Sequence, residues 1–206
     1  MKSLLTAVCL VAGFAGQAEV ISLTIGIDVN SPYGLSEPWV TIRDGLLRLD
    51  YVESVGNLPD RKTATGELRT KHGRVPDVAA LAIAVRELGA GATLRGIEAT
   101  VHGHLKKQGS DLLLKVSTTG ETLRLAPLTK AIQRGADTPQ AEREAFAKLS
   151  AQLNREPVEV RIIGPLRARA APGAPQTLEV RTVDLRTVPQ AVGENLSCVN
   201  SKPGAK

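Results

Sequence analysis

The amino-acid sequence predicts an α+β fold made of two units, and two features of its hydrophobic pattern carry that prediction. In residues 19–92, segments with strand-like alternation are separated by two segments with the apolar spacing of helices. From Thr93 onward the pattern becomes almost entirely β, with a single helical interruption. We therefore expect a first unit at 19–92 and a second at 93–187, between a leader at 1–18 and a disordered tail at 188–206.

The first unit is expected to begin with a strand at 19–29, followed by a helix, two strands and a second helix. Apolar residues from Trp39 to Leu49 recur at helical spacing. We expect Ser36 to cap this helix, with Pro38 in its first turn. Together with the strand that begins at Thr93, the order is the βαββαβ order of a ferredoxin-like unit. The remaining segments are strands at 50–56 and 66–75 and a helix at 78–89 that Pro76 and Asp77 open.

The second unit is predicted to be an OB-like five-stranded barrel with one helix. Its first strand places Ile97, Ala99 and Val101 on one face, and His102 and His104 on the other. Three strands, a helix and two strands form the order of an OB-fold. The later segments are strands at 112–117 and 122–125, a helix at 140–153, and a hairpin of two strands at 158–168 and 176–185.

Two family resemblances accompany these predictions. Residues 39–55, where a helix ends in LLRLDYVESV, and residues 77–91 (DVAALAIAVRELGAG) resemble a heavy-metal-associated domain. In that family the metal binds a Cys-x-x-Cys pair in the loop before the first helix. The corresponding loop here, residues 30–35 (NSPYGL), contains no cysteine, so soft thiolate ligation of a metal is not available there. The second unit resembles small exported bacterial OB-fold domains in the order of its elements.

The N-terminus has the layout of a signal peptide. Lys2 precedes an apolar run from Leu4 to Ala15, and small residues at Gly16 and Ala18 favour cleavage after Ala18. No later segment approaches the roughly 20 apolar residues of a membrane span. We therefore expect a secreted or periplasmic protein without a membrane span. Cleavage would leave Cys198 as the last cysteine, which cannot form an internal disulfide.

His102 and His104 are the candidate metal ligands. Residues two apart on a strand point the same way, roughly 6.5 to 7 Å apart, so two imidazoles could bind one zinc or copper ion. Glu98 lies on the same face but about 13 Å from His102 by the same rise. The third histidine, His72, would have to come from the first unit. The alternative interpretation is that these histidines are polar residues on the outer face of the barrel.

Enzymatic and nucleic-acid functions are disfavoured by what the sequence lacks. It contains no G-x-S-x-G elbow, phosphate loop, dinucleotide fingerprint, EF-hand loop or Cys-x-x-Cys pair. Single-stranded nucleic acids bind basic grooves with aromatic side chains for stacking. Aromatic residues make up only 2% of the chain, and Phe146 is expected in the helix that closes the barrel. We predict a protein that is not an enzyme and that has no nucleic-acid partner.

The remaining hypothesis is a non-catalytic binding or accessory role in the cell envelope, with an unknown envelope protein or small ligand as partner. One candidate contact is the basic stretch from Arg161 to Arg169, which contains no acidic residue. Another is residues 30–39, where Tyr33 and Trp39 lie, although Trp39 also fits a core position. The alternative function is a periplasmic metal-binding protein that uses the His-x-His motif.

Overall fold

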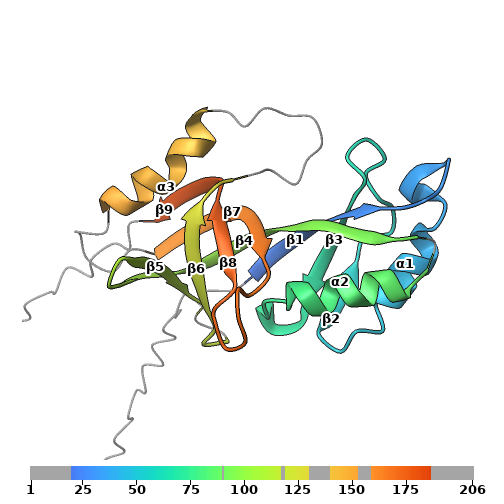
Figure 1. The fold of residues 1–206 in the computed structure, drawn as a ribbon, viewed down its shortest axis with the longest axis horizontal. Helices are drawn as coiled ribbons and strands as arrows, with labels where there is room; N and C mark the ends of the chain where they lie inside the picture. Colours follow the sequence, from blue (N-terminus) through green and yellow to red (C-terminus); the bar gives the residue numbers. More distant parts are fainter. Residues whose placement is uncertain (1–19, 90, 117–118, 130–139, 153–158, 187–206) are drawn as a thin grey trace, which may run out of the picture.

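The computed structural model describes residues 20–89, 91–116, 119–129, 140–152 and 159–186. The described residues form a mixed α+β fold with one nine-stranded sheet, as Figure 1 shows. The predicted leader and tail, with Cys198, lie outside them. The strands are β1 (Val20–Asp28), β2 (Val52–Val55), β3 (Thr65–Thr70), β4 (Thr93–Gln108), β5 (Asp111–Lys115), β6 (Thr122–Pro127), β7 (Glu159–Arg167), β8 (Thr177–Val180) and β9 (Thr182–Arg186). The helices are α1 (Trp39–Leu46), α2 (Val78–Glu87) and α3 (Gln140–Gln152), with 3-10 turns η1 (Gly34–Ser36) and η2 (Lys71–Gly73).

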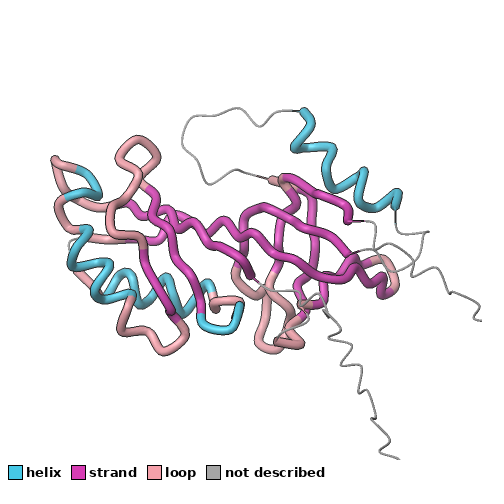
Figure 2. The backbone as a smooth tube through the Cα atoms, turned by 180° about the vertical axis from the view of Figure 1, so that it is seen from behind, coloured by secondary structure: helices cyan, strands magenta, loops and turns pink. Residues whose placement is uncertain are grey.

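Strand β4 is shared by both halves of the sheet. Along one edge, residues 93–101 pair with β1 and residues 104–108 pair with β5. Along the other edge, residues 97–104 pair with β7. The middle of β4 therefore has a partner strand on each side, and the sheet runs through it without interruption (Figure 2).

The first half contains the predicted succession of strand, helix, strand, strand, helix and strand. Its strands lie in the order β2-β3-β1-β4, and every neighbouring pair is antiparallel. Helices α1 and α2 contact each other and lie against the sheet (Figure 1). Leu23, Ile25 and Leu68 from the strands and Ile42 and Leu81 from the helices are fully buried. No helix in the described residues has the length and apolar character needed to cross a membrane.

The structure confirms one predicted helix start and corrects another. The Asp77 side chain caps α2 by accepting hydrogen bonds from the amides of Ala79 and Ala80, at 2.9 and 3.1 Å. The prediction that Ser36 caps α1 was wrong. Ser36 ends the η1 turn, and Pro38 occupies the N-cap position, where no side chain makes a capping hydrogen bond.

Trp39 is a core residue held in a fixed orientation. Its ring is fully buried, and its Nε1 donates to the carbonyl oxygens of Gly56 and Asn57 at 3.1 Å each. The ring packs directly on Gly66 of β3, where a Cβ atom would lie 2.1 Å from it. Trp39 is therefore excluded as a surface contact, and Gly66 is required for this packing.

In the second half, five strands form a closed hydrogen-bonded ring, β4-β5-β6-β8-β7, because β7 also pairs with β4. The β6–β8 pair is parallel, and the other pairs are antiparallel. Apolar side chains from all five strands are buried. Helix α3 contacts β6, β8 and β9, and its half-buried Phe146 packs against this core. The predicted ends of this helix, at 137–139 and at Leu153, lie outside the described residues.

The last predicted strand, 176–185, is in fact two strands that meet at Arg181. Strand β8 pairs with β6 and with the end of β7, whereas β9 pairs with residues 159–163 of β7. The backbone of β8 passes so close to Gly164 that a Cβ atom there would lie 1.7 Å from the Glu179 carbonyl oxygen. A glycine in β7 thus permits the close approach at which the chain changes partner strands.

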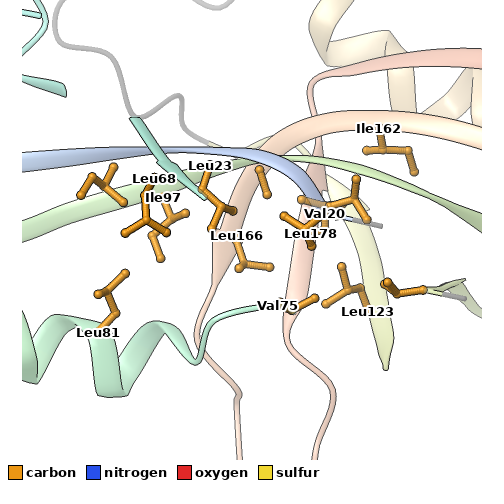
Figure 3. Packing of buried hydrophobic residues seen from close by; sticks show 14 of the residues in the cluster. Val20, Leu23, Leu68, Val75, Leu81, Ile97, Leu123, Ile162, Leu166 and Leu178 are labelled. Atoms are coloured by element: carbon orange, nitrogen blue, oxygen red, sulfur yellow. The ribbon is translucent and has the colours of Figure 1, made fainter. Parts of the chain in front are cut away.

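The two halves share one hydrophobic core. Leu23, Leu68 and Ile97 lie at one end of the view in Figure 3, and Leu123 and Ile162 lie at the other. Buried hydrophobic side chains from both halves belong to a single cluster. Burial of this cluster stabilises both halves together.

Glu179 is a buried carboxylate on β8 that joins three segments of the ring. It accepts hydrogen bonds from the amide and hydroxyl of Thr129, at 3.1 and 2.7 Å, and from Nε and Nη2 of Arg167, at 3.0 and 3.1 Å. Burial alone would raise the pKa of Glu179. The hydrogen bonds from Arg167 and Thr129 outweigh it and hold the pKa below its ordinary value.

We expect the stabilisation by Glu179 to be present at neutral pH and to be lost as the pH falls through its lowered folded-state pKa. In that range the unfolded state binds the proton more readily than the folded state. Glu179→Gln should lower the free energy of unfolding by about 1.5–3 kcal/mol at neutral pH, because hydrogen bonds to a charged group are lost. Urea unfolding of both proteins across an acidic pH series measures this difference. If the difference in unfolding free energy between the two proteins stayed constant with pH, the Glu179 carboxylate would not have a lowered pKa in the folded state.

Candidate functional site

The three histidines are not brought together as a metal site. His72 is exposed in η2, in the first half, with a left-handed φ of 55°. His102 and His104 are half-buried on β4, opposite Arg161 and Glu159 of β7 respectively. Among the residues that the structure describes, no three His, Cys, Asp or Glu side chains form a group that could hold a metal ion. The predicted third ligand is therefore missing, and a guanidinium beside His102 disfavours a cation there.

The arginines of the basic stretch are mostly occupied by acidic partners. Arg161 Nη1 lies 3.8 Å from Asp184 on β9, and Arg167 is bound to Glu179. Arg169 Nε lies 3.6 Å from Asp77, and its Nη1 donates to the carbonyl oxygen of Ala174 at 2.8 Å. The stretch does not present three free cations on one surface, and the acidic partners come from segments that are distant in sequence.

A groove of about 550 Å³ is the candidate binding site, and its volume lies within the range of ligand pockets. Two loops of the ring, between β5 and β6 and between β7 and β8, form it together with residues of β4, β5 and β6 and with the segment that leads into α2. In Figure 1 the β7–β8 loop hangs beneath the ring, beside the turn between β5 and β6. The lining residues are Val75, Lys106, Gln108, Leu113, Lys115, Glu121, Thr122, Leu123, Arg169, Gly173, Pro175 and Gln176.

One wall of the groove is fixed by hydrogen bonds between the two halves. Gln176, which is 2% exposed, donates from Nε2 to the Pro76 carbonyl at 2.9 Å and accepts at Oε1 from the Val78 amide at 3.0 Å. Glu121 Oε2 accepts from the Val75 amide at 3.0 Å and from the Thr119 hydroxyl at 3.2 Å. The ring therefore holds both ends of the segment before α2, and the groove has contributions from both halves.

The charge of the groove favours an anion. Three basic residues line it, and its single acidic residue, Glu121, is already occupied by two donors. Lys106 and Lys115 are exposed, and neither makes a hydrogen bond or ion pair with another described residue. Two ammonium groups are therefore available to a ligand, whereas Arg169 is partly committed to Asp77.

Sequence reasoning missed this groove. It gave no role to Lys106, Lys115, Glu121 or Gln176. The hydrogen bonds of Gln176 join residues 98 and 100 positions apart. No local pattern signals a pairing of that kind. The available signal was the alternation in β4 and β5, which places Lys106 and Lys115 on the outward faces of their strands.

The two aromatic residues of the predicted contact segment at 30–39 differ in exposure. Tyr33 is 76% exposed, whereas Trp39 is in the core. Tyr33 lines a second cavity, of about 410 Å³, together with Arg61 and residues 34–37. The Ser31 hydroxyl donates to Glu37, which closes the loop on itself. This cavity has fewer available charged groups than the groove, so the groove is the stronger candidate.

Comparison with protein-family models, with curated proteins and with solved structures finds no match to this chain. The function is therefore inferred from the geometry and charge of the groove.

Proposed function

We propose that the protein is an exported, non-catalytic binding or accessory protein of the cell envelope, and that the groove binds an anionic ligand. The observation that carries the proposal is the pair of available ammonium groups, Lys106 and Lys115, beside a floor of buried side chains. The signal-peptide layout of residues 1–18 supports export.

The architecture supports the same proposal. The order β2-β3-β1-β4 with two helices is the arrangement expected of a ferredoxin-like unit. The ring β4-β5-β6-β8-β7 with α3 agrees with an OB-like barrel. In such barrels the loops at the strand ends are places where ligands bind. The groove lies beside two loops of this kind, between β5 and β6 and between β7 and β8.

The experiment is a titration of the mature protein, residues 19–206, with poly-L-glutamate, followed by amide NMR. We expect the largest shifts at Leu113, Thr122 and Gly173, which line the groove. The double variant Lys106→Glu/Lys115→Glu should bind at least about tenfold more weakly, equivalent to about 1.4 kcal/mol. Higher salt should weaken binding by the parent protein, because exposed charges are screened.

The matched control is Arg48→Glu/Lys62→Glu, which makes the same change in net charge at exposed positions of the first half. It should bind poly-L-glutamate as the parent does, and poly-L-lysine should give no shifts in the groove. If the two double variants weaken binding equally, net charge alone explains it. That result, or an absence of shifts in the groove, would overturn the proposal.

A further inference from the structure

The outward face of β5 places an apolar side chain among the basic residues of the groove. Leu113 is half-buried and lies opposite Lys106 on β4 and opposite Arg124 on β6. Lys115 follows two residues later on the same face, roughly 7 Å along the strand. Arg124 is engaged by Asp111, at 3.1 Å. Leu113 is therefore flanked by two available ammonium groups.

Three further lining residues are apolar. Val75 and Leu123 are almost fully buried, and Pro175 lies in the β7–β8 loop. Arg169 and Ala174 hold that loop together through the hydrogen bond from the guanidinium to the carbonyl oxygen. The lining residues Lys106, Lys115 and Gly173 are exposed, so a ligand bound in the groove would stay in contact with water on one side. The groove thus combines an anion-binding end with an apolar floor.

The spacing of the two lysines suits an extended chain. Lys106 and Lys115 are diagonal neighbours across the β4–β5 pair, because Lys106 faces Leu113. Diagonal neighbours lie about 7–8 Å apart. Residues two apart in an extended peptide lie roughly 6.5–7 Å apart and point the same way. Two acidic side chains at positions i and i+2 would therefore reach one lysine each, and the next residue on that side would lie beyond Lys115, toward Val75 and Pro175.

We infer that the ligand of the groove is an extended acidic peptide segment of a partner protein, with the pattern acidic-x-acidic-x-apolar read along one side. This inference rests on the proposed function, since it names the ligand class of the same groove. The acidic side chains bind Lys106 and Lys115 on either side of Leu113, and the apolar side chain packs on Val75 and Pro175. The charges position the peptide, and the apolar contact discriminates among acidic peptides.

The test uses three labelled peptides and the mature protein, with fluorescence anisotropy as the readout. The peptides are acetyl-Gly-Glu-Ser-Glu-Ser-Leu-Gly-amide, its analogue with Ser in place of Leu, and its analogue with Lys in place of both Glu. We expect the first to bind, the second to bind at least about tenfold more weakly because it lacks the Leu side chain that is buried on binding, and the third not to bind.

Protein variants separate the two contributions. Lys106→Gln/Lys115→Gln should abolish binding of both acidic peptides, whereas Pro175→Ser should remove only the preference for the peptide that contains Leu. Pro175 is exposed in the β7–β8 loop, so this variant should fold as the parent does. Equal affinity for the Leu and Ser peptides, with poly-L-glutamate still bound in the groove, would overturn the inference and leave the proposed function standing. No binding of poly-L-glutamate or of any peptide would overturn both.

Discussion

Replacing Glu98 by alanine is expected to lower the free energy of unfolding by about 3–5 kcal/mol, because it leaves the charge of Arg181 buried without its counterion. The Glu98 carboxylate on β4 is paired with the Arg181 guanidinium at the junction of β8 and β9, and their side chains are only 11% and 16% exposed. Burial lowers the pKa of Arg181, because the charged guanidinium is less well solvated in the protein than in water. Urea unfolding of parent and variant measures the loss.

An exposed ion pair of the same sheet provides the control. Asp111 and Arg124 lie 3.1 Å apart with side chains about half exposed, at 46% and 53%. Asp111→Ala should change stability by less than about 1 kcal/mol, as is usual for surface pairs. The double variant Glu98→Leu/Arg181→Met should recover most of the loss from Glu98→Ala, because no charge then remains buried. If Glu98→Ala cost no more than Asp111→Ala, the buried pair would not be a determinant of stability.

Gln176→Ala is the second change expected to have a large effect, about 2–4 kcal/mol, because it leaves two buried backbone groups without partners. These are the carbonyl of Pro76 and the amide of Val78, which Gln176 joins to the ring. Urea unfolding measures the loss of stability. Hydrogen exchange at the Val78 amide reports directly on its hydrogen bond to Gln176. We expect the Val78 amide to exchange much faster in the variant.

Two neighbouring positions sharpen the test. Asp77 caps the amides of Ala79 and Ala80, so their exchange should change far less than that of Val78. Gln108→Ala removes an exposed glutamine from the same groove and should leave stability and exchange unchanged. Unchanged exchange at Val78 in Gln176→Ala would show that the Gln176 side chain does not hold the segment before α2 against the ring.

The parts of the fold that sequence reasoning predicted depend on local patterns. The alternation along β4 predicted a buried face with Ile97, Ala99 and Val101, and these residues are at most 1% exposed. Pro76 and Asp77 were predicted to open α2. A short acidic side chain at this position can reach two amides of the first turn. Both signals are contained within a few residues, so no knowledge of the tertiary structure was needed.

The parts that it missed depend on contacts between distant segments. The segment 176–185 was predicted as one strand, but it divides at Arg181, where β8 approaches Gly164; its apolar residues also shift there, from Leu178 and Val180 to Val183 and Leu185. The partners of Gln176 lie 98 and 100 positions away. The His-x-His motif was recognisable, whereas the lack of a third ligand among the described residues became evident only in three dimensions.

The central residues of β4 also constrain how the length of this chain can vary between related proteins. Residues 97–101 are paired on both edges, and the pairing with β7 runs through eight residues without a register shift. A single inserted residue would turn Ile97, Ala99 and Val101 toward the opposite face, because the side-chain period of a strand is two. The partner strand on each edge would have to shift at the same time. We therefore expect insertions and deletions in homologues to be confined to the loops, and the centre of β4 to keep its length.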